Sequence, residues 1–367
     1  MIVSVIGLGY IGLPTAAIIA SNGVKVIGVD IDKDTINIIN QGKAHIIEPD
    51  LDSLVKSSVE SGSLVATNKP QKSDVFIITV PTPFLDDYSP DLSYIKSAVK
   101  SIAPVLEKGN IVILESTSPV GTTEEMARLL ESERQDLIFP ELDDNSINFD
   151  VSIAYCPERV MPGNIISELI ENNRIIGGMT KTCSKRAIDV YQIFVKSECM
   201  TSDCRTAELA KLVENSFRDV NIAFANELSL ISDKLNINVW NLIKLTNHHP
   251  RVNILKPGPG VGGHCIAVDP WFIINSLPDE TKLIKAAREV NDRKPQYILS
   301  LIDKAIKSTS KEISDINISC LGISFKADID DLRGSPALKI VNSLCQYNFN
   351  RLNIVEPNIS ELPSSIN

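Results

Sequence analysis

The first thirty residues place a glycine-rich turn between two apolar segments, and this arrangement restricts the fold more than any other feature of the sequence. Residues 1–6 are apolar and predict a short strand, which runs directly into Gly7-Leu8-Gly9-Tyr10-Ile11-Gly12. Small and apolar residues at 13–21 predict a helix, and residues 24–29 predict a second buried strand that ends at Asp30. A strand, a glycine turn, a helix, a strand and an acid in this order are typical of a dinucleotide-binding parallel sheet.

The three glycines and the acid have separate roles in such a site. Gly7 permits the tight turn, Gly9 lets the backbone approach a pyrophosphate, and Gly12 lets the helix pack close to the strand. The free N–H groups and positive dipole at the helix N-terminus attract the anion. Asp30 lies 18 residues after Gly12, where a carboxylate binds the ribose 2′-hydroxyl and repels a 2′-phosphate, so NAD is favoured over NADP. The alternative for the glycine segment is a turn that only joins the strand to the helix.

Further strands follow at regular intervals. Residues 75–80 run into Pro81-Thr82-Pro83, and residues 111–115 run into Ser116-Thr117. They alternate with segments of helical pattern at 34–40, 92–106 and 124–133. This alternation predicts an α/β fold that begins with a Rossmann-type, doubly wound parallel sheet. Because ligands bind at the carboxyl edge of such a sheet, Thr82 and Thr117 are candidates for the nicotinamide side, and simple turn or cap residues are the alternative.

The composition excludes several functions. The 367 residues are too many for one compact core and predict two or three domains. The 36 Lys and Arg residues are outnumbered by 46 Asp and Glu and form no basic block, so no nucleic-acid partner is expected. The apolar stretches are shorter than the ~20 residues that cross a bilayer, so no membrane insertion is expected.

The cysteines indicate a reducing compartment. There are seven, an odd number, and they are scattered over a large chain, which predicts reduced thiols and a cytoplasmic location rather than a disulfide framework. Cys199 and Cys204 form the one close pair, and neither a second pair nor spaced histidines complete a metal site. We therefore expect no bound metal.

Residues 205–236 contain neither Pro nor Gly and predict one long helix. Apolar residues recur every three or four positions along it, at Leu209, Val213, Phe217, Val220, Phe224, Leu228, Ile231 and Leu235. About 30 residues of helix span ~45 Å, which suggests a helix that bridges two domains and offers a dimerisation face, and an internal core helix is the alternative. Lys211 and Asn215 are four residues apart and share one face of this helix.

The segment 256–270 reads KPGPGVGGHCIAVDP and predicts a defined, irregular loop. Gly262 and Gly263 let the backbone approach a ligand, and Cys265 and Asp269 follow them. A thiol beside such a loop is a candidate nucleophile when its pKa is lowered. The alternative is a cysteine that serves only in packing.

These segments and several others resemble, in order and over almost the whole chain, the UDP-glucose/UDP-mannose dehydrogenase family. The matching stretches are GLGYIGLP (7–14), VPTP (80–83), ESTSPVGTT (115–123), YCPERVMPG (155–163), AELAKLVENSFRDVNIAFANEL (207–228), GPGVGGHCIAVDP (258–270) and FKADIDDLRGSPAL (325–338). The resemblance implies an NAD-binding domain at 1–200, a central helical dimerisation domain with the catalytic Cys loop at 201–312, and an incomplete C-terminal, UDP-binding Rossmann-like domain at 313–367. We expect residues after about 314 to be loosely held, because a single βαβ unit buries little apolar surface.

The resemblance implies a four-electron oxidation, in which a UDP-sugar C6 alcohol becomes a carboxylate and two NAD are reduced in turn. Cys265 would form a thiohemiacetal and then a thioester, Lys211 and Asn215 would face the C6 oxyanion, Glu158 would be the base in thioester hydrolysis, and Thr117 and Asp269 would position water. Cofactor contacts are implied at Gly7, Gly9, Tyr10, Ile11, Gly12, Asp30, Thr82, Thr117 and Arg333. Substrate contacts are implied at Glu158, Arg159, Val160, Lys211, Asn215, Arg251, Gly258, Gly262 and Lys326, with Asn221 as a further candidate.

The GGHCIAVDPW form and the NHHPRVN segment (247–253) resemble the branch of the family that converts UDP-N-acetyl-D-mannosamine to UDP-N-acetyl-D-mannosaminuronate, an acidic sugar for surface polysaccharide. Oxidation of UDP-glucose remains an alternative, as does a two-electron β-hydroxyacid dehydrogenase, which needs no Cys265. A third alternative is an inactive, truncated relic that binds NAD and forms dimers.

Overall fold

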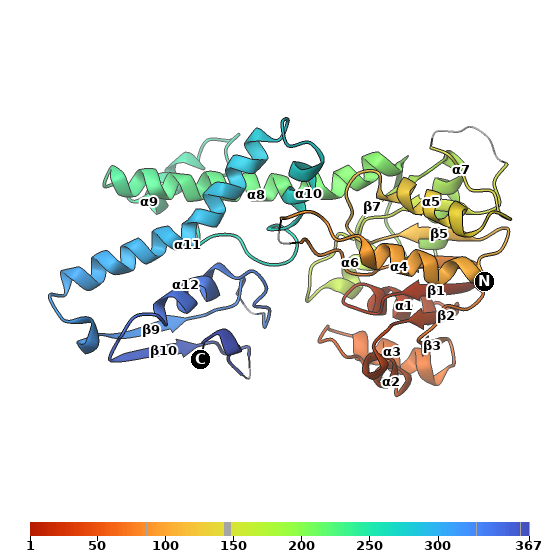
Figure 1. Cartoon of the computed structure of the whole chain (residues 1–367), viewed down its shortest axis with the longest axis horizontal. Helices are drawn as coiled ribbons and strands as arrows, with labels where there is room; N and C mark the ends of the chain where they lie inside the picture. Colours follow the sequence, from red (N-terminus) through yellow and green to blue (C-terminus); the bar gives the residue numbers. More distant parts are fainter. Residues whose placement is uncertain (86, 143–147, 328, 360, 367) are drawn as a thin grey trace. The chain divides into compact units, whose positions relative to one another are not determined.

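The structure is a computed structural model that describes residues 1–85, 87–142, 148–327, 329–359 and 361–366. The chain divides into two compact units, Met1–Leu212 and Val213–Asn367, here called unit 1 and unit 2 (Figure 1). The predicted division into three domains at 200 and 312 stays a prediction. Each unit is described by itself below.

Unit 1 is built on one sheet of eight strands in the order β3-β2-β1-β4-β5-β6-β7-β8 (Figure 1). The strands are β1 (Ile2–Ile6), β2 (Lys25–Val29), β3 (Leu64–Thr67), β4 (Val75–Ile78), β5 (Ile111–Leu114), β6 (Ser152–Tyr155), β7 (Arg174–Gly178) and β8 (Cys199–Asp203). The strand order reverses direction beside β1, where β4 pairs in parallel with it. This reversal places the loops after β1 and β4 at the edge where doubly wound sheets bind their ligands.

Helices cover both faces of the sheet. They are α1 (Gly12–Ser21), α2 (Lys33–Asn40), α3 (Leu51–Glu60), α4 (Ser93–Ile102), α5 (Thr122–Glu133), α6 (Ile165–Glu171) and α7 (Lys181–Tyr191), with a short 3-10 turn at Ala103–Val105. Successive strand residues point to opposite faces, so Val3 and Val5 of β1 join a core with α1, α3 and α6. Ile6 joins the other core, which contains α4 and α5.

The predicted α/β fold with a Rossmann-type sheet is confirmed. The strands expected at 1–6, 24–29, 75–80 and 111–115 correspond to β1, β2, β4 and β5. One pair departs from the parallel pattern, because β7 runs antiparallel to β6 with Tyr155 opposite Gly177. The chain therefore enters β7 at the same edge of the sheet where it leaves β6, and no crossover connection is needed between these two strands.

Unit 2 contains most of the long helix and the C-terminal elements. Its elements are the later part of α8 (Cys204–Lys234), then α9 (Val239–Thr246), α10 (Asp269–Ser276), α11 (Lys282–Ser308), β9 (Asn317–Leu321), α12 (Pro336–Leu344) and β10 (Arg351–Val355), with 3-10 turns at Ile313–Asp315 and Ser364–Ile366. β9 and β10 form a separate parallel pair. Leu299 of α11 packs with Ile340 and Leu344 of α12 in a small apolar cluster.

The long helix predicted at 205–236 is present as α8, which has 31 residues. Its apolar stripe is largely exposed in the single chain, and Phe217 is 67% exposed. The other exposed members are Leu209, Val213, Phe224, Ile231 and Leu235. The internal core helix, which was the alternative, does not describe these side chains.

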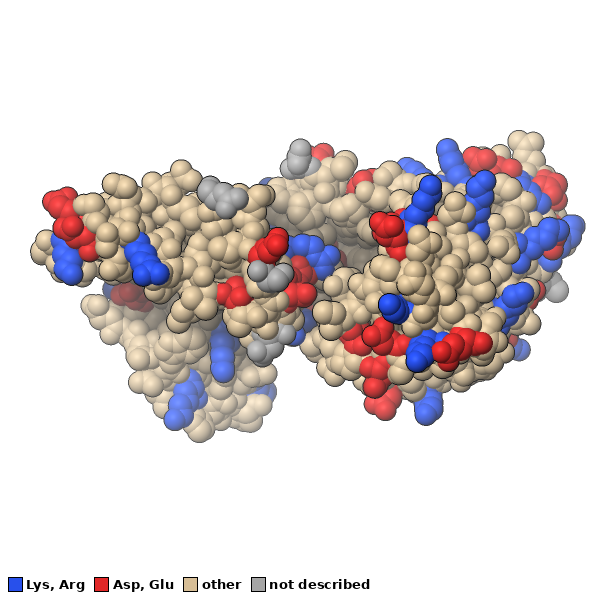
Figure 2. Space-filling view, turned by 90° about the horizontal axis from the view of Figure 1, so that it is seen from below, with Lys and Arg blue, Asp and Glu red and all other residues tan. Residues whose placement is uncertain are grey.

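The surface carries charges of both signs. In the view of Figure 2, Lys and Arg side chains are interspersed with Asp and Glu side chains and do not gather into one block. Among the described residues, no helix combines the length and the apolar character needed to span a bilayer.

We predict that the β9–β10 pair exchanges its amide hydrogens much faster than the central strands of unit 1. The pair has only two strands, whose residues are exposed or half-buried, whereas β4 and β5 are buried throughout, and exchange follows the free energy of local opening. Hydrogen exchange followed by mass spectrometry would measure this difference. Strong protection across residues 316–355, equal to that of β4, would contradict it.

Candidate functional site

The glycine turn after β1 has the close approaches that the sequence predicted. Gly7 has a φ of +94°, a conformation that side chains with a Cβ disfavour. A Cβ on Gly12 would lie 1.8 Å from the carbonyl oxygen of Gly7, so only glycine lets α1 start against the turn. A Cβ on Gly9 would meet no atom of the chain within 4 Å. The backbone at Gly9 is therefore open to a ligand.

The carboxylate of Asp30 holds the turn against the end of β2. Its Oδ2 accepts a hydrogen bond from the backbone N–H of Leu8 at 2.8 Å, and its Oδ1 accepts one from Asp32 at 2.9 Å. Tyr10 is exposed and Ile11 half-buried where α1 begins, and no side chain caps the first turn of α1. An uncapped helix start beside an open glycine backbone fits the pyrophosphate of NAD. The contact of Asp30 with a ribose stays a prediction.

The loops after β4 and β5 are joined by hydroxyl groups. Thr82 Oγ1 donates to the carbonyl oxygen of Thr117 at 2.6 Å, and Ser116 Oγ donates to the carbonyl oxygen of Val80 at 2.7 Å. The structure thus brings together the two threonines that the sequence selected, at the carboxyl edge beside the glycine turn. Their assignment to the nicotinamide side stays a prediction.

Arg174 of the antiparallel strand β7 is hydrogen-bonded to the predicted base Glu158. Tyr155 of β6 lies opposite Gly177 of β7, and continuing this register by three residues sets Glu158 opposite Arg174. The Nη2 of Arg174 donates to Oε2 of Glu158 at 3.2 Å, and the other oxygen of Glu158 accepts from the backbone N–H of Arg159 at 2.6 Å. Arg174 is only 4% exposed, so this pair is fixed from within the unit. The sequence analysis did not select Arg174, because its partner is set by strand register.

The loop that follows Glu158 is held by a second buried carboxylate. The two oxygens of Glu48 accept hydrogen bonds from the backbone N–H groups of Gly163 at 2.9 Å and Ile165 at 2.7 Å. Arg159 Nη1 donates to the carbonyl oxygen of Asn173 at 3.3 Å, and Val160 packs against the core. Glu48 precedes this loop by more than a hundred residues, and no local pattern in the sequence indicates its role.

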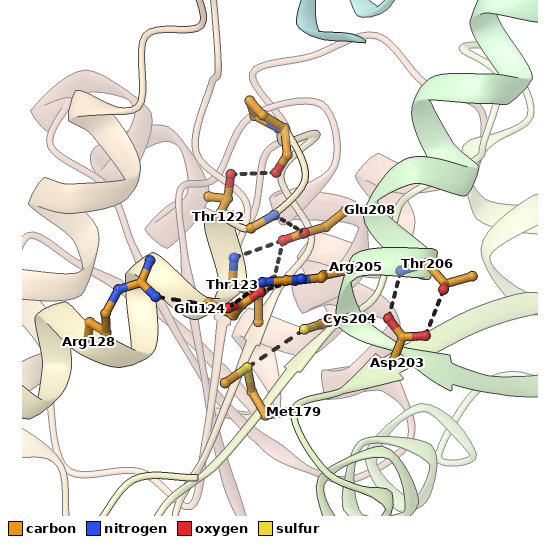
Figure 3. Close-up of polar contacts among 12 residues, drawn as sticks. Thr122, Thr123, Glu124, Arg128, Met179, Asp203, Cys204, Arg205, Thr206 and Glu208 are labelled. Carbon is orange, nitrogen blue, oxygen red and sulfur yellow. Dashed lines mark hydrogen bonds and ion pairs between the residues drawn. The ribbon is translucent and has the colours of Figure 1, made fainter. Parts of the chain in front are cut away.

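The start of α8 is anchored to the N-terminus of α5 by Glu208 (Figure 3). Oε2 of Glu208 accepts from the backbone N–H of Gly121 at 2.6 Å, and Oε1 accepts from the N–H and the hydroxyl of Thr123 at 2.8 and 2.6 Å. The side chain is 0% exposed. Burial raises the pKa of Glu208 to about 6, although these hydrogen bonds oppose the increase. Beside it, Arg205 pairs with Glu124 at the surface of the same contact (Figure 3).

Downstream of this anchor, α8 carries the two polar residues selected from the sequence. Lys211 is half-buried and lies one turn before Asn215 on the same helix. Asn215 Nδ2 donates to Oδ2 of Asp269 at 2.5 Å, and Asp269 is 2% exposed. The backbone N–H of Asp269 in turn donates to the carbonyl oxygen of Cys265 at 2.9 Å. Within unit 2, the structure therefore links Asn215, Asp269 and the turn that contains the half-buried Cys265.

The glycine-rich loop before Cys265 lies against the segment before α12. A Cβ on Gly262 would lie 2.8 Å from the carbonyl oxygen of Gly334. The N–H of Gly263 donates to the carbonyl oxygen of Arg333 at 2.9 Å, and a Cβ on Gly263 would meet the ring of Phe325. The two glycines thus permit a close approach of two backbone segments. The sequence analysis had expected them to approach a ligand, and that expectation stays a prediction.

The start of the same loop is held by a buried polar network between α8 and α11. The N–H of Gly258 donates to Oδ1 of Asn226 at 2.8 Å, and Asn226 Nδ2 donates to Oδ1 of Asn291 at 2.8 Å. Asn291 Nδ2 donates to Oδ1 of Asp219 at 2.8 Å, and Arg288 Nη1 donates to the same oxygen at 2.6 Å. None of these four side chains was predicted from the sequence, because their pairing depends on how two helices pack.

The remaining selected residues of unit 2 lie at its surface. The guanidinium of Arg333 forms an ion pair with Asp331 at 2.6 Å, and His264 Nδ1 lies 3.6 Å from the same carboxylate. Lys326 and Arg251 are exposed, and Asn221 is half-buried and donates to the carbonyl oxygen of Phe217. Their predicted contacts with cofactor and substrate stay predictions. Asp328, which belongs to the acidic run before Arg333, lies outside the described residues.

Comparison with protein families gives three consecutive matches. Residues 1–195 match the NAD binding domain of the UDP-glucose/GDP-mannose dehydrogenase family, residues 205–293 its central domain, and residues 319–367 its UDP binding domain. The chain belongs to this family. As a member of the UDP-glucose/GDP-mannose dehydrogenase family it is an NAD-dependent dehydrogenase of nucleotide sugars, which confirms the predicted enzyme class and cofactor.

Three relatives show how close the similarity is. The UDP-N-acetyl-D-mannosamine dehydrogenase of Campylobacter jejuni is 61% identical over 98% of this chain and 88% of its own length. The NDP-N-acetyl-D-galactosaminuronic acid dehydrogenase of Ralstonia nicotianae is 54% identical over 99% of this chain and 85% of its own. The solved UDP-D-ManNAc dehydrogenase of Pyrococcus horikoshii is 42% identical, with a TM-score of 0.89 over 96% of this chain and 83% of its own.

Two glycine substitutions separate folding from cofactor binding. Gly9→Ala meets no protein atom, so we predict an unchanged melting temperature and at least tenfold weaker NAD binding, because the methyl group would occupy the path of the pyrophosphate. Gly12→Ala collides with the turn and should lower the melting temperature itself. Thermal unfolding and NAD titration would measure both. Wild-type NAD affinity in the Gly9→Ala variant would contradict the predicted position of the pyrophosphate.

Removal of the Glu208 carboxylate should loosen the start of α8. Glu208→Ala leaves the N–H groups of Gly121 and Thr123 without their acceptor, at a cost of roughly 1–3 kcal/mol for each buried donor. Urea unfolding would measure the loss, and Glu125→Gln, which alters a pair that is half exposed, is the matched control, with an expected change below about 1 kcal/mol. Equal losses of unfolding free energy in the two variants would contradict the proposed role of Glu208 in holding the start of α8.

The contribution of Glu208 to the stability of the fold should also depend on pH. Because folding raises the pKa of Glu208 from 4.5 to about 6, the folded state binds this proton more tightly than the unfolded state. The stability of the wild type relative to Glu208→Gln should therefore fall as the pH rises from 4.5 to 6 and stay level above that. A difference that grows in favour of the wild type over this range would contradict the raised pKa.

Proposed function

We propose that the protein oxidises the C6 alcohol of UDP-N-acetyl-D-mannosamine to the carboxylate of UDP-N-acetyl-D-mannosaminuronate, with two NAD reduced for each sugar. One observation carries this proposal: Asn215 of α8 is hydrogen-bonded to the buried Asp269, whose N–H donates to the carbonyl oxygen of Cys265. A dehydrogenase that stops at the carbonyl has no use for a cysteine in the turn that adjoins this polar pair.

The thiol explains how one site performs two oxidations. NAD, when bound, supplies the acceptor for the hydride that leaves C6 in each oxidation. After the first, Cys265 Sγ adds to the aldehyde carbon, and the carbonyl oxygen gains a proton, which gives a thiohemiacetal. After the second, the carbon is a thioester, and hydrolysis releases the acid and restores the thiol. The covalent bond keeps the aldehyde from escaping between the two steps.

The other candidate residues would stabilise the charges that develop in this chemistry. Lys211 and Asn215 share a face of α8, and an ammonium group together with an amide N–H would stabilise the C6 oxyanion. The ammonium would also favour the thiolate form of Cys265. Glu158 would accept the proton of the attacking water, and Thr117 and Asp269 would position that water. Asn215 would serve both the oxyanion and the water, because it is hydrogen-bonded to Asp269.

The other contacts divide between sugar nucleotide and cofactor. We propose that the loop after Glu158, with Arg159 and Val160, binds the substrate together with Arg251, Gly258, Gly262 and Lys326. The fixed position of this loop, which Glu48 holds through two backbone N–H groups, supports the assignment. Tyr10, Ile11, Thr82 and Arg333 would contact NAD.

The choice of the mannosamine sugar is supported by the relatives. A UDP-N-acetyl-D-mannosamine dehydrogenase has the higher identity, 61%, and the relative whose name refers to galactosaminuronic acid has 54%. The NHHPRVN segment at 247–253 also favours this branch. UDP-glucose is the second candidate, and its oxidation would use the same residues.

We also propose that the active form is a homodimer formed through α8, in the cytoplasm, and that the acidic product serves surface polysaccharide synthesis. The exposed apolar stripe that includes Phe217 and Phe224 supports a self-complementary interface. All seven cysteines of the chain are free thiols, in keeping with a reducing compartment. Size-exclusion chromatography with light scattering tests the dimer.

The proposed reaction is tested by counting reduced cofactor. The protein is incubated with limiting UDP-N-acetyl-D-mannosamine and excess NAD, NADH is followed at 340 nm, and the product is identified by mass spectrometry. Two NADH for each sugar and a uronic acid product are expected. One NADH with a carbonyl product would favour the two-electron β-hydroxyacid dehydrogenase chemistry, and NAD binding without turnover of any UDP-sugar would favour the inactive relic.

The proposed role of the Cys265 thiol gives a separate prediction. Cys265→Ser should stop the second oxidation, because the serine hydroxyl is far less acidic and is a poorer leaving group than a thiol, so steady two-NADH turnover should fall at least a hundredfold. Cys345→Ser is the matched control and should leave turnover unchanged. Full two-NADH turnover in Cys265→Ser would overturn the thioester route.

A further inference from the structure

Beneath Glu158 lies a buried cluster of titratable groups that the proposed reaction does not use. Glu115 follows β5, Cys156 follows β6, Arg174 begins β7 and Tyr191 ends α7. Arg174 is 4% exposed, Glu115 is 2% exposed, and Tyr191 and Cys156 are completely buried. Burying an ion pair away from water costs free energy unless its geometry is good. We therefore asked what this cluster contributes to the reaction.

Arg174 is shared between two carboxylates. Its Nη2 donates to Oε2 of Glu158 at 3.2 Å, and its Nη1 lies 3.8 Å from Oε1 of Glu115. The Tyr191 hydroxyl donates to the same Oε1 of Glu115 at 2.5 Å. Arg174 also lies over the ring of Tyr191, 4.8 Å from its centroid. The guanidinium therefore faces one carboxylate with each of its two terminal nitrogens.

The two carboxylates differ in their access to solvent. Glu158 lines a small surface pocket together with Arg174, whereas the side chain of Glu115 is 0% exposed. Oε2 of Glu115 has no hydrogen-bond partner among the described residues. Glu115 is thus the inner member of the pair, and it can take up a proton without breaking a contact.

We propose that Glu115, with Tyr191, is a positioning device that controls through Arg174 how readily Glu158 accepts a proton from water. This rests on the proposed role of Glu158 in thioester hydrolysis and adds a regulation to it. When Glu115 is ionised, it shares the guanidinium, and Glu158 is the stronger base. When Glu115 is protonated, Arg174 pairs with Glu158 alone and holds it in the charged form, so Glu158 accepts a proton less readily.

The charge states of the neighbours agree with this arrangement. Burial raises the pKa of Glu115 to about 7, Arg174 opposes the increase, and Glu158 adds to it. Burial raises the pKa of Cys156 to about 12 and that of Tyr191 well above its usual value, so both stay neutral. Burial works against the charge of Arg174, but the carboxylates of Glu158 and Glu115 outweigh it and hold the pKa of Arg174 well above its usual value. Glu115 is therefore the group of this cluster that changes charge near neutral pH.

The test is the decay of the Cys265 thioester as a function of pH. The protein is mixed with UDP-N-acetyl-D-mannosamine and NAD, quenched at intervals, and the acyl adduct is followed by intact-protein mass. The wild type should show a rate that rises through a midpoint near pH 7. Glu115→Gln, which mimics the protonated form, should match the wild type at pH 6, be about three- to tenfold slower at pH 8, and lack this midpoint.

Tyr191→Phe provides a second variant with a different expected result. It removes the hydrogen bond that lowers the pKa of Glu115, so the midpoint should move to higher pH by about half a unit or more. Glu125→Gln, at a surface ion pair, should leave the profile unchanged. The amplitude of the NADH burst and circular dichroism report whether each variant is folded.

The outcomes are distinct. A Glu115→Gln profile that keeps the midpoint near pH 7, or a decay rate lowered by the same factor at every pH, would overturn the proposal and indicate a purely structural cluster. Absence of any NADH burst in the folded wild type would instead overturn the proposed reaction.

Discussion

The buried carboxylate of Glu208 is the contact that fixes the start of α8 against the rest of unit 1. A buried carboxylate is stabilised when donors occupy its oxygens, and here the donors are two backbone N–H groups and a hydroxyl from the N-terminus of α5. These hydrogen bonds fix the start of a continuous helix of 31 residues. Lys211 and Asn215 then take their positions from the helical repeat alone.

Other segments that carry candidate chemistry are fixed in the same way. The loop after Glu158 is held by Glu48, and the start of the loop before Cys265 is held by Asn226. Asn226 comes from α8, whereas Glu48 lies in the segment between α2 and α3, and both are buried side chains that accept hydrogen bonds from backbone N–H groups. Substitutions at such positions would act on the chemistry through the shape of a loop, which distinguishes them from loss of a reacting group.

Local features of the fold could be predicted from the sequence, and features set by register could not. The glycine turn, its flanking strands and the long helix follow from the spacing of neighbouring residues, and Gly7 and Gly12 have the close approaches expected of them. The pairing of Arg174 with Glu158 depends on an antiparallel register between β6 and β7. No periodicity in the sequence indicates that register, and the sequence analysis had expected a sheet that was parallel throughout.

The same limit applies to the candidate site. Cys265 and Asp269 are close in sequence and were selected together, whereas the contact of Asp269 with Asn215 joins residues that are 54 positions apart. Buried acids such as Glu208 and Glu48 have no local signature, because a glutamate in a polar stretch is usually exposed. Their burial becomes visible only when the elements are packed.

The most direct test of the thiol mechanism is to trap the sugar on the protein. The wild type is acid-quenched during turnover with UDP-N-acetyl-D-mannosamine and NAD, digested, and its peptides are sequenced by mass spectrometry. If Cys265 is the nucleophile, the peptide that contains it carries the mass of the acyl sugar nucleotide, and the adduct disappears when NAD is omitted. Full conversion to the acid without any adduct on Cys265 at any time of quenching would contradict the mechanism.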